Sequence, residues 1–178
     1  MSTSFTMRTK NILITGPPGI GKTTIIKKIS HDLQHLNPFG FFTEEIRVGG
    51  IRKGFSLVSL DGRRATLSHT DIASQDRVGK YGVDVAAFED FLDHIAFFKP
   101  DVGLIIIDEI GKMECISDKF NRFIKMVLEQ ERPVVAAISR KGEGIIEEIK
   151  RRADVELFLM TQNNRDSLLP KILRLFHT

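Results

Sequence analysis

Eight residues near the start of the chain have the types and spacing of a phosphate-binding loop. They are Gly16-Pro17-Pro18-Gly19-Ile20-Gly21-Lys22-Thr23, which follow the pattern G-x-x-x-x-G-K-T. Glycines let the backbone turn tightly and bring amide N–H groups close to a phosphate, and the positive end of a following helix favours an anion. We therefore expect Lys22 to reach the outer phosphates of a nucleotide, and the hydroxyl of Thr23 to join the coordination of Mg²⁺.

A second group of residues suited to phosphate chemistry lies farther along the chain. The apolar run 104–107 ends in two adjacent carboxylates, Asp108 and Glu109, which is a Walker B pattern. We expect Asp108 to hold Mg²⁺, mostly through a bound water, and Glu109 to orient or deprotonate the attacking water. Both motifs follow strand-like runs, so in a parallel sheet they would face the same crevice.

Several charged residues in neighbouring loops are weaker candidates for the same site. Lys112 is a candidate for neutralising phosphate charge, and Glu114 for supporting the metal shell. Ser139 is a candidate sensor of the γ-phosphate, with Arg140 or Lys141 as an internal arginine finger. For most of these residues a solvated surface position explains the sequence equally well.

The segment around Tyr81 offers a further set of candidates. Arg77 and Lys80 are alternative sources of positive charge for the transition state, and Tyr81 is a candidate for stacking on a base. An aromatic residue in such a segment more often packs against the core, and both interpretations stay open at this point.

Strand-like and helix-like runs alternate along most of the chain. We expect strands over 12–15, 39–45, 51–60, 63–68, 102–107, 133–138 and 155–160. We expect helices over 22–36, 85–98, 118–130, 143–153 and from Asn163 or Asn164 to about 176, with Asp84 and Ser117 as N-caps. This alternation predicts an α/β fold in which helices cover both faces of a mostly parallel sheet.

One segment departs from the alternation. Asp61-Gly62 stands between two strand-like runs, which is a strong signal for a β-hairpin over residues 51–68. A tight turn joins only antiparallel strands, so this hairpin is predicted to be an insertion in the parallel sheet. We expect the following residues, 69–82, to form a loop.

Length and composition limit the kind of protein this can be. A chain of 178 residues predicts a single domain over 1–178, with residues 1–10 as a flexible polar lead-in. The net charge of +3 suits an anionic substrate but gives no indication of nucleic-acid binding. Cys115 is the one cysteine in the sequence, and no apolar run is long enough to span a membrane. We expect a cytoplasmic protein. The sequence leaves its oligomeric state open and is compatible with a monomer.

Four segments together resemble one family. They are Gly-Pro-Pro-Gly-Ile-Gly-Lys-Thr-Thr, Gly-Phe-Phe-Thr-Glu-Glu-Ile-Arg, Val-Gly-Lys-Tyr-Gly-Val-Asp and Ile-Ile-Asp-Glu-Ile-Gly-Lys-Met-Glu. This combination is similar to the small P-loop nucleoside-triphosphatase family, which is known from thermophilic microbes and includes the cancer-related nucleoside-triphosphatase of animals. The likeness extends over about residues 11–160. The P-loop alone is shared by countless proteins, and the later segments make the resemblance specific.

The resemblance implies a fold, an activity and a set of binding residues. The fold would be a RecA-like three-layer sandwich, in which another strand lies between the P-loop strand and the Walker B strand. The activity would be slow, Mg²⁺-dependent hydrolysis of several nucleoside triphosphates (ATP, GTP, CTP, UTP and TTP) to the diphosphate and phosphate, with Glu109 as base and Lys22 as the phosphate-binding cation. By motif match, the nucleotide-binding positions would be Gly16, Pro17, Pro18, Gly19, Ile20, Gly21, Lys22, Thr23, Thr24, Asp108, Glu109, Ile110 and Gly111.

Two other functions stay open from the residues alone. One is a small nucleotide or nucleoside kinase, for which the expected arginine-rich lid is thin here. The other is a nucleotide-gated switch that binds RNA or protein, with hydrolysis incidental. Broad base selectivity is expected in every case because the recognisable polar residues address phosphates, and no guanine-specific signature is present in the sequence.

Overall fold

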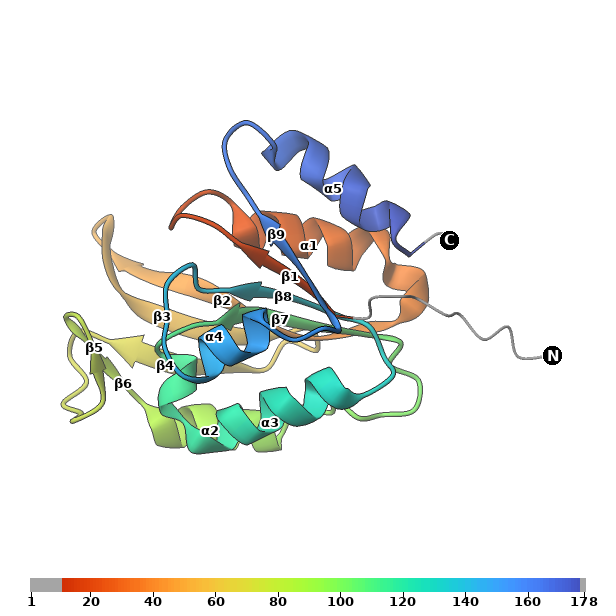
Figure 1. The fold of residues 1–178 in the computed structure, drawn as a ribbon. Helices are drawn as coiled ribbons and strands as arrows, with labels where there is room; N and C mark the ends of the chain where they lie inside the picture. The colour runs from red at the N-terminus through yellow and green to blue at the C-terminus, as the bar shows by residue number, and fades with distance from the viewer. Residues whose placement is uncertain (1–10, 177–178) are drawn as a thin grey trace.

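The computed structural model describes residues 11–176, and these form one twisted sheet with helices on both faces (Figure 1). Within this part of the chain the sheet has nine strands, in the order β5-β6-β4-β3-β2-β7-β8-β1-β9. The strands are β1 (Asn11–Thr15), β2 (Pro38–Val48), β3 (Ile51–Ser59), β4 (Arg64–His69), β5 (Arg77–Val78), β6 (Tyr81–Val83), β7 (Leu104–Ile110), β8 (Val134–Ile138) and β9 (Val155–Leu159). The helices are α1 (Lys22–Asp32), α2 (Val85–Asp93), α3 (Asp118–Glu129), α4 (Ile145–Lys150) and α5 (Arg165–Arg174), with 3₁₀ turns at Gln34–Leu36 and Glu114–Ile116.

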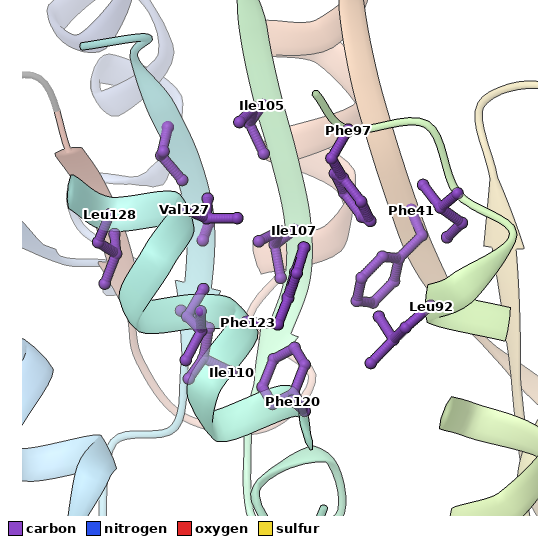
Figure 2. Packing of buried hydrophobic residues seen from close by; sticks show 14 of the residues in the cluster. Phe41, Leu92, Phe97, Ile105, Ile107, Ile110, Phe120, Phe123, Val127 and Leu128 are labelled. Atoms are coloured by element: carbon purple, nitrogen blue, oxygen red, sulfur yellow. The ribbon is translucent and has the colours of Figure 1, made fainter. Parts of the chain in front are cut away.

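The helices form two layers. Helices α1 and α5 cover one face of the sheet, and α2, α3 and α4 lie on the other (Figure 1). A separate apolar cluster fills each interface, because side chains alternate between the faces of a strand. On the α3 side, phenylalanines and branched aliphatic residues of the helices pack against Ile105 and Ile107 of β7 (Figure 2). The three-layer arrangement predicted from the sequence is confirmed.

The four strands β7, β8, β1 and β9 form the parallel part of the sheet. All five residues of β1 and of β8 are buried, as expected for strands covered on both faces. Strand β8 lies between β7 and β1, which it pairs in parallel on either side. This confirms the strand that the resemblance placed between the P-loop strand and the Walker B strand.

Strand β2 connects the parallel part to an antiparallel extension. Its first residues, 38–41, pair in parallel with residues 104–107 of β7. From Phe41 onward it pairs antiparallel with β3, which in turn pairs antiparallel with β4. The hairpin predicted around Asp61-Gly62 is therefore confirmed, although β2 is longer than expected and forms a second hairpin with β3.

The predicted loop over residues 69–82 is wrong in its second half. Strands β5 and β6 form there, and β6 pairs with β4, so the sheet continues. The two strands are joined by Gly79 and Lys80, and Gly79 has a φ of 58°, in the left-handed region. Short strands joined through Gly-Lys lack the Asn-Gly or Asp-Gly signal that identifies such turns in a sequence.

Helix α2 ends earlier than its apolar pattern predicts. It stops at Asp93, and the chain then places Phe97 rather than Phe98 in the core: Phe97 is 1% exposed and Phe98 is 42% exposed. The Phe97 ring packs against Phe39, Phe41 and Phe123, which a continuous helix would not allow. Tertiary packing thus overrides the helical periodicity at this end.

The predicted helix starts are mostly correct. The side chain of Asp84 accepts a hydrogen bond from the Ala87 amide at 2.9 Å, and that of Ser117 accepts one from the Phe120 amide at 3.0 Å. Asn164 occupies the N-cap position of α5 as predicted, but its side chain makes no capping bond, because its Oδ1 accepts from the Thr161 amide at 2.8 Å. Helix α4 is shorter than expected, starting at Ile145 and ending at Lys150. Across residues 11–176, no helix has both the length and the apolar character needed to cross a membrane.

Candidate active site

The predicted phosphate-binding loop connects β1 to α1 and requires glycine at several positions. Gly19 and Gly21 have φ values of 74° and 108°, in the left-handed region that favours glycine. A Cβ atom on Gly16 would lie 2.6 Å from the carbonyl oxygen of Met160 on the neighbouring chain segment. The loop therefore needs glycine both for its turns and for its packing beside the end of β9.

Lys22 lies over the loop rather than extending into solvent. Its Nζ donates hydrogen bonds to the carbonyl oxygens of Gly16 at 3.1 Å and Pro17 at 3.2 Å. The ammonium group is thus held at the opening of the amide-rich loop, where a phosphate would compete for it. Being the first residue of α1, Lys22 also lies at the positive end of that helix.

The P-loop and the Walker B strand meet at Thr23 and Asp108. The hydroxyl of Thr23 lies close enough to the carboxylate of Asp108 to lower the pKa of that group. The two residues are 85 positions apart in the sequence, but Thr23 lies at the start of the helix after β1, and Asp108 lies near the carboxyl end of β7 in the same parallel group. The expected convergence of the two motifs is therefore present.

Asp108 is almost completely buried, with 2% of its surface exposed. Burial raises its pKa to about 6, and the negative charge of Glu109 acts in the same direction. The nearby Thr23 hydroxyl, the Thr43 amide and the charge of Lys22 act against this rise. A positive charge bound beside Asp108 would favour its ionised form.

Thr43, on β2, is a site residue that sequence reasoning did not select. Its amide donates to Oδ2 of Asp108 at 3.5 Å, and its hydroxyl donates to the Asp108 carbonyl oxygen. Thr43 is in the Gly-Phe-Phe-Thr segment that contributes to the family resemblance. Its contact with Asp108 depends on β2 pairing with β7, and the sequence does not specify that pairing.

Glu109 lies at the edge of a small polar cluster. The peptide bond between Asp108 and Glu109 is cis, and Ser139 Oγ donates to Glu109 Oε1 at 3.2 Å. A Cβ on Gly111 would lie 2.9 Å from Oε2 of Glu114 and 3.2 Å from Oγ of Ser139. Gly111 is therefore where the backbone makes room for two carboxylates and a hydroxyl.

Glu114 is the most deeply buried acid of this cluster, with 4% of its surface exposed. Burial, together with the negative charge of Glu109, raises its pKa to about 8. The backbone amides of Glu114 and Gly111 donate to its carboxyl and act in the opposite direction. At neutral pH the Glu114 carboxyl is therefore mainly protonated and able to donate a hydrogen bond.

Two cavities of about 440 Å³ each flank the P-loop. The first lies between Pro17, Pro18 and Gly19 on one side and the segment Thr161, Gln162 and Asn163 on the other, with Arg140 at its wall. The second lies between the loop and the start of α5. The 161–163 segment was not among the residues predicted for the site, because its amide side chains carry no motif.

The basic side chains predicted as candidates for neutralising phosphate charge lie at different places in the structure. Arg140 is exposed and lines the first of these cavities, next to the P-loop. Lys112 and Lys141 are exposed and line another cavity together, beside Cys115. Arg77 donates to the carbonyl oxygens of Lys80 at 2.7 Å and Ile72 at 3.4 Å, so its guanidinium group is engaged by the backbone of the surrounding turn.

Tyr81 is a packing residue. It is 7% exposed, its ring meets that of Phe55 edge-on with centroids 5.5 Å apart, and its hydroxyl accepts from Arg52 Nε at 3.0 Å. The aromatic face is thus already occupied, which favours the packing interpretation over stacking on a base.

The oxygen groups at the meeting point suit a magnesium ion that also binds phosphate. Over residues 11–176, no group of three or more His, Cys, Asp or Glu side chains is placed to hold a metal ion. Mg²⁺ usually keeps several waters and takes one or two protein ligands in addition to substrate phosphates. One carboxylate and one hydroxyl beside a phosphate-binding loop meet that requirement.

Comparison with known proteins agrees with this geometry. The sequence model of the family described as NTPase matches residues 11–173. Nucleoside-triphosphatase THEP1 of Thermotoga sp. strain RQ2 is 48% identical over 166 residues, which cover 91% of this chain and 92% of that protein. The human cancer-related nucleoside-triphosphatase is 36% identical over 179 residues, covering 92% of this chain and 94% of that one.

A solved structure shows the same fold. The crystal structure of THEP1 from Aquifex aeolicus superposes with a TM-score of 0.84 at 37% identity, covering 93% of this chain and 98% of that one. The solution structure of the human cancer-related nucleoside triphosphatase superposes with a TM-score of 0.77, also at 37% identity. The chain therefore belongs to the NTPase family of small P-loop nucleoside-triphosphatases.

Proposed function

We propose that this protein hydrolyses the terminal phosphoanhydride bond of nucleoside triphosphates in a Mg²⁺-dependent reaction with broad base selectivity. The observation that supports this best is that the Thr23 hydroxyl lies close enough to the buried Asp108 carboxylate to lower its pKa, with Glu109 adjacent. That contact brings a phosphate-binding loop, an oxygen-rich cation site and a potential base to one place. Family membership supports the same activity.

The P-loop residues would bind the triphosphate. The amide N–H groups of the loop, which Pro17 and Pro18 lack, would face the phosphates, and Lys22 would exchange its bonds to the Gly16 and Pro17 carbonyls for bonds to the outer phosphates. Thr23 and Asp108 would hold the Mg²⁺ ion, with nucleotide-binding positions continuing through Ile110 and Gly111. When bound, Mg²⁺ neutralises charge on the phosphate oxygens and so favours attack at the γ-phosphorus.

Glu109 is the proposed general base. It is partly exposed, lies directly after the buried Asp108 and is oriented by the hydroxyl of Ser139. A carboxylate in this position accepts a proton from a water placed for in-line attack, and the proton then passes to solvent. General base catalysis contributes roughly 10²- to 10⁴-fold to a reaction rate.

The cavity beside the P-loop is the proposed site of the base and sugar. Gln162 and Asn163 offer both donor and acceptor groups there, and Arg140 offers a flat cation at the wall. Amide side chains can turn over to match different hydrogen-bonding edges, so this lining suits ATP, GTP, CTP, UTP and TTP without strict selection.

The direct test is phosphate release from each of these five triphosphates, with Mg²⁺ and with a chelator in its place. We expect release from all five that depends on Mg²⁺ and needs no added acceptor. In the variant Glu109→Gln we expect nucleotide binding to be retained and phosphate release to fall about 10³-fold. Glutamine has nearly the same size and shape as glutamate, but it cannot act as the general base.

The matched control is Glu131→Gln, an exposed acid just before β8, at the other end of that strand from Ser139. It should release phosphate at the wild-type rate. If Glu109→Gln is as active as this control, Glu109 is not the base. If the wild-type protein releases no phosphate from any triphosphate, the proposed hydrolysis is wrong.

A further inference from the structure

Next to Glu109, on the side away from the first P-loop cavity, lies a smaller cavity of about 240 Å³. Glu109, Gly111 and Ser139 line it on the side of the proposed catalytic centre. The opposite wall comes from the antiparallel extension, with Phe55 on β3, Leu67 on β4 and Val78 on β5. Met113, from the loop after β7, is a further apolar residue of the lining.

This cavity is larger and more apolar than the attack of a water molecule requires. A water occupies about 30 Å³ in the liquid, so the space corresponds to roughly eight waters. A water needs two to four polar partners, and the apolar side chains at one wall offer none. An apolar surface with a few polar groups at one end is typical of a site for a small organic molecule.

The charged groups of the lining restrict which molecule would fit. Two carboxyl groups, Glu109 and Glu114, line the cavity, and the lysine among its described lining residues, Lys112, is exposed. No arginine is among them. Because Glu114 is mainly protonated at neutral pH, a phosphate group on the ligand would meet the negative charge of Glu109 without a buried cation, which is unfavourable.

The apolar wall is held in place by contacts of its own. The Phe55 ring meets the Tyr81 ring edge-on, and Arg52 covers Phe55 with its guanidinium carbon 5.2 Å from the ring centroid. Arg52 is fixed in turn by its bond to the Tyr81 hydroxyl and by an ion pair with Glu45 at 2.9 Å. The inserted strands thus build a shaped surface opposite the base.

We propose that this cavity is an acceptor site, which binds a small uncharged molecule with an apolar face and a hydroxyl group directed at Glu109. In the presence of such a molecule the protein transfers the γ-phosphoryl group to it instead of to water. This inference depends on the proposed function, because the same nucleotide site and the same base are used.

The transfer is balanced without any further reactant. The acceptor hydroxyl loses its proton to the Glu109 carboxylate, and its oxygen forms a bond to the γ-phosphorus. The bond from that phosphorus to the oxygen bridging to the β-phosphate breaks, and the nucleoside diphosphate leaves with the electron pair. The products are a phosphate monoester, the diphosphate and a proton that Glu109 returns to solvent.

The test uses the full-length protein with Mg²⁺ and ATP labelled in the γ-phosphate. Benzyl alcohol, thymidine and thymidine monophosphate are added separately as probes, and both labelled monoester and free phosphate are measured. We expect monoester from benzyl alcohol or thymidine, and at least tenfold less phosphorylated product from thymidine monophosphate. A preference for thymidine monophosphate, or free phosphate with no monoester from any probe, would overturn the acceptor site.

A pair of variants tests the location of the site. Val78→Trp should fill the cavity from a half-buried position on β5 and lower the ratio of monoester to free phosphate at least tenfold. Val48→Trp is the matched control, because Val48 is an exposed residue at the end of β2, outside the cavity. It should leave that ratio unchanged, and equal ratios in the two variants would contradict the assignment.

A binding measurement in the wild-type protein needs no variant. Addition of benzyl alcohol should shift the methyl signals of Leu67 and Val78 and leave those of Val48 and Leu157 in place. Methyl shifts elsewhere with none at Leu67 or Val78 would overturn the site. Absence of any phosphate release, with or without probes, would instead show that the proposed hydrolysis itself fails.

Discussion

The two ends of the sheet are built differently and hold different groups. The parallel strands β7, β8 and β1 are buried, β9 forms the edge beside them, and at their carboxyl ends lie the P-loop, Asp108 and the cavity near Gln162. The antiparallel strands β3, β4, β6 and β5 contribute mainly apolar side chains facing Glu109, and the turn between β2 and β3 is flanked by the exposed Val48 and Ile51. Strand β2 belongs to both parts, and Thr43 lies where its pairing changes.

The residues proposed to bind phosphate and metal therefore come from the parallel strands and the segments after them, and the apolar surface opposite them comes from the antiparallel strands. Parallel strands direct several loops to one edge, so residues distant in sequence can surround one phosphate chain. The antiparallel strands instead present a surface, and contacts such as Phe55 with Tyr81 fix its form. Changes in the parallel part should therefore affect nucleotide chemistry, while changes in the extension should affect stability or the acceptor cavity.

The largest effect on the parallel part is expected from Lys22→Ala. Loss of the ammonium group removes a charge-assisted contact to the outer phosphates, and we expect kcat/KM for ATP to fall about 10²- to 10³-fold, with weaker binding as well. Lys125→Ala, on the outer surface of α3, is the control and should behave as wild type. Full activity of the Lys22 variant would rule out the P-loop role and remove the distinction between the two parts of the sheet.

The second-largest effect is expected on the pH dependence of stability in the variant Glu114→Gln, because this carboxyl group lies between the parallel and antiparallel parts of the sheet. The folded protein holds a proton on Glu114 up to about pH 8, whereas an unfolded chain releases it near pH 4.5. Between these values the folded state binds more protons, so the free energy of unfolding falls as pH rises. Glutamine removes this contribution and keeps the side-chain oxygen.

We expect Glu114→Gln to match wild type near pH 4.5 and to be more stable at pH 8 by about 2 kcal/mol. Each unit of pKa shift corresponds to about 1.4 kcal/mol, of which relaxation of the site takes up part. The rise of the Asp108 pKa to about 6 should make the free energy of unfolding of both proteins fall as pH rises from about 4 to 6. Urea unfolding over this range measures the difference, with the exposed Glu131→Gln as control. Parallel curves would show that Glu114 is not buried as described.

The smallest effect is expected from Tyr81→Phe in the extension. The change removes the hydrogen bond from Arg52 and keeps the ring that packs on Phe55. We expect a loss of about 1 kcal/mol in the free energy of unfolding, and phosphate release from ATP within about twofold of wild type. A large loss of activity with unchanged stability would mean that Tyr81 contacts the nucleotide after all.

The two parts also differ in how well the sequence predicts them. The P-loop and the fully buried β8 are local patterns with a known geometry, so β1, β8 and β9 were predicted to within one residue. The Walker B strand was predicted over 102–107, but β7 starts at Leu104 and continues through Asp108 and Glu109 to Ile110. Strands β5 and β6 are two and three residues long, and their turn has no distinctive dipeptide. Such elements form because β4 offers an edge to pair with, which is tertiary information.

The same reasoning explains which site residues were missed. Lys22, Thr23, Asp108 and Glu109 belong to motifs whose chemistry is readable from residue type and spacing. Thr43 and Gln162 are ordinary polar residues, and they lie at the site because of strand order and the course of the chain after β9. Their positions follow only once the sheet is assembled.

The most direct test of the central claim is a crystal structure of the Glu109→Gln variant with ATP and Mg²⁺. The variant should retain nucleotide long enough to be observed, because its turnover is expected to be slow. We predict the triphosphate in the loop of residues 16–24, the ion between Thr23 and Asp108, and the γ-phosphate facing residue 109. A nucleotide bound elsewhere, or a triphosphate in the loop with its ion held away from Asp108, would contradict the account.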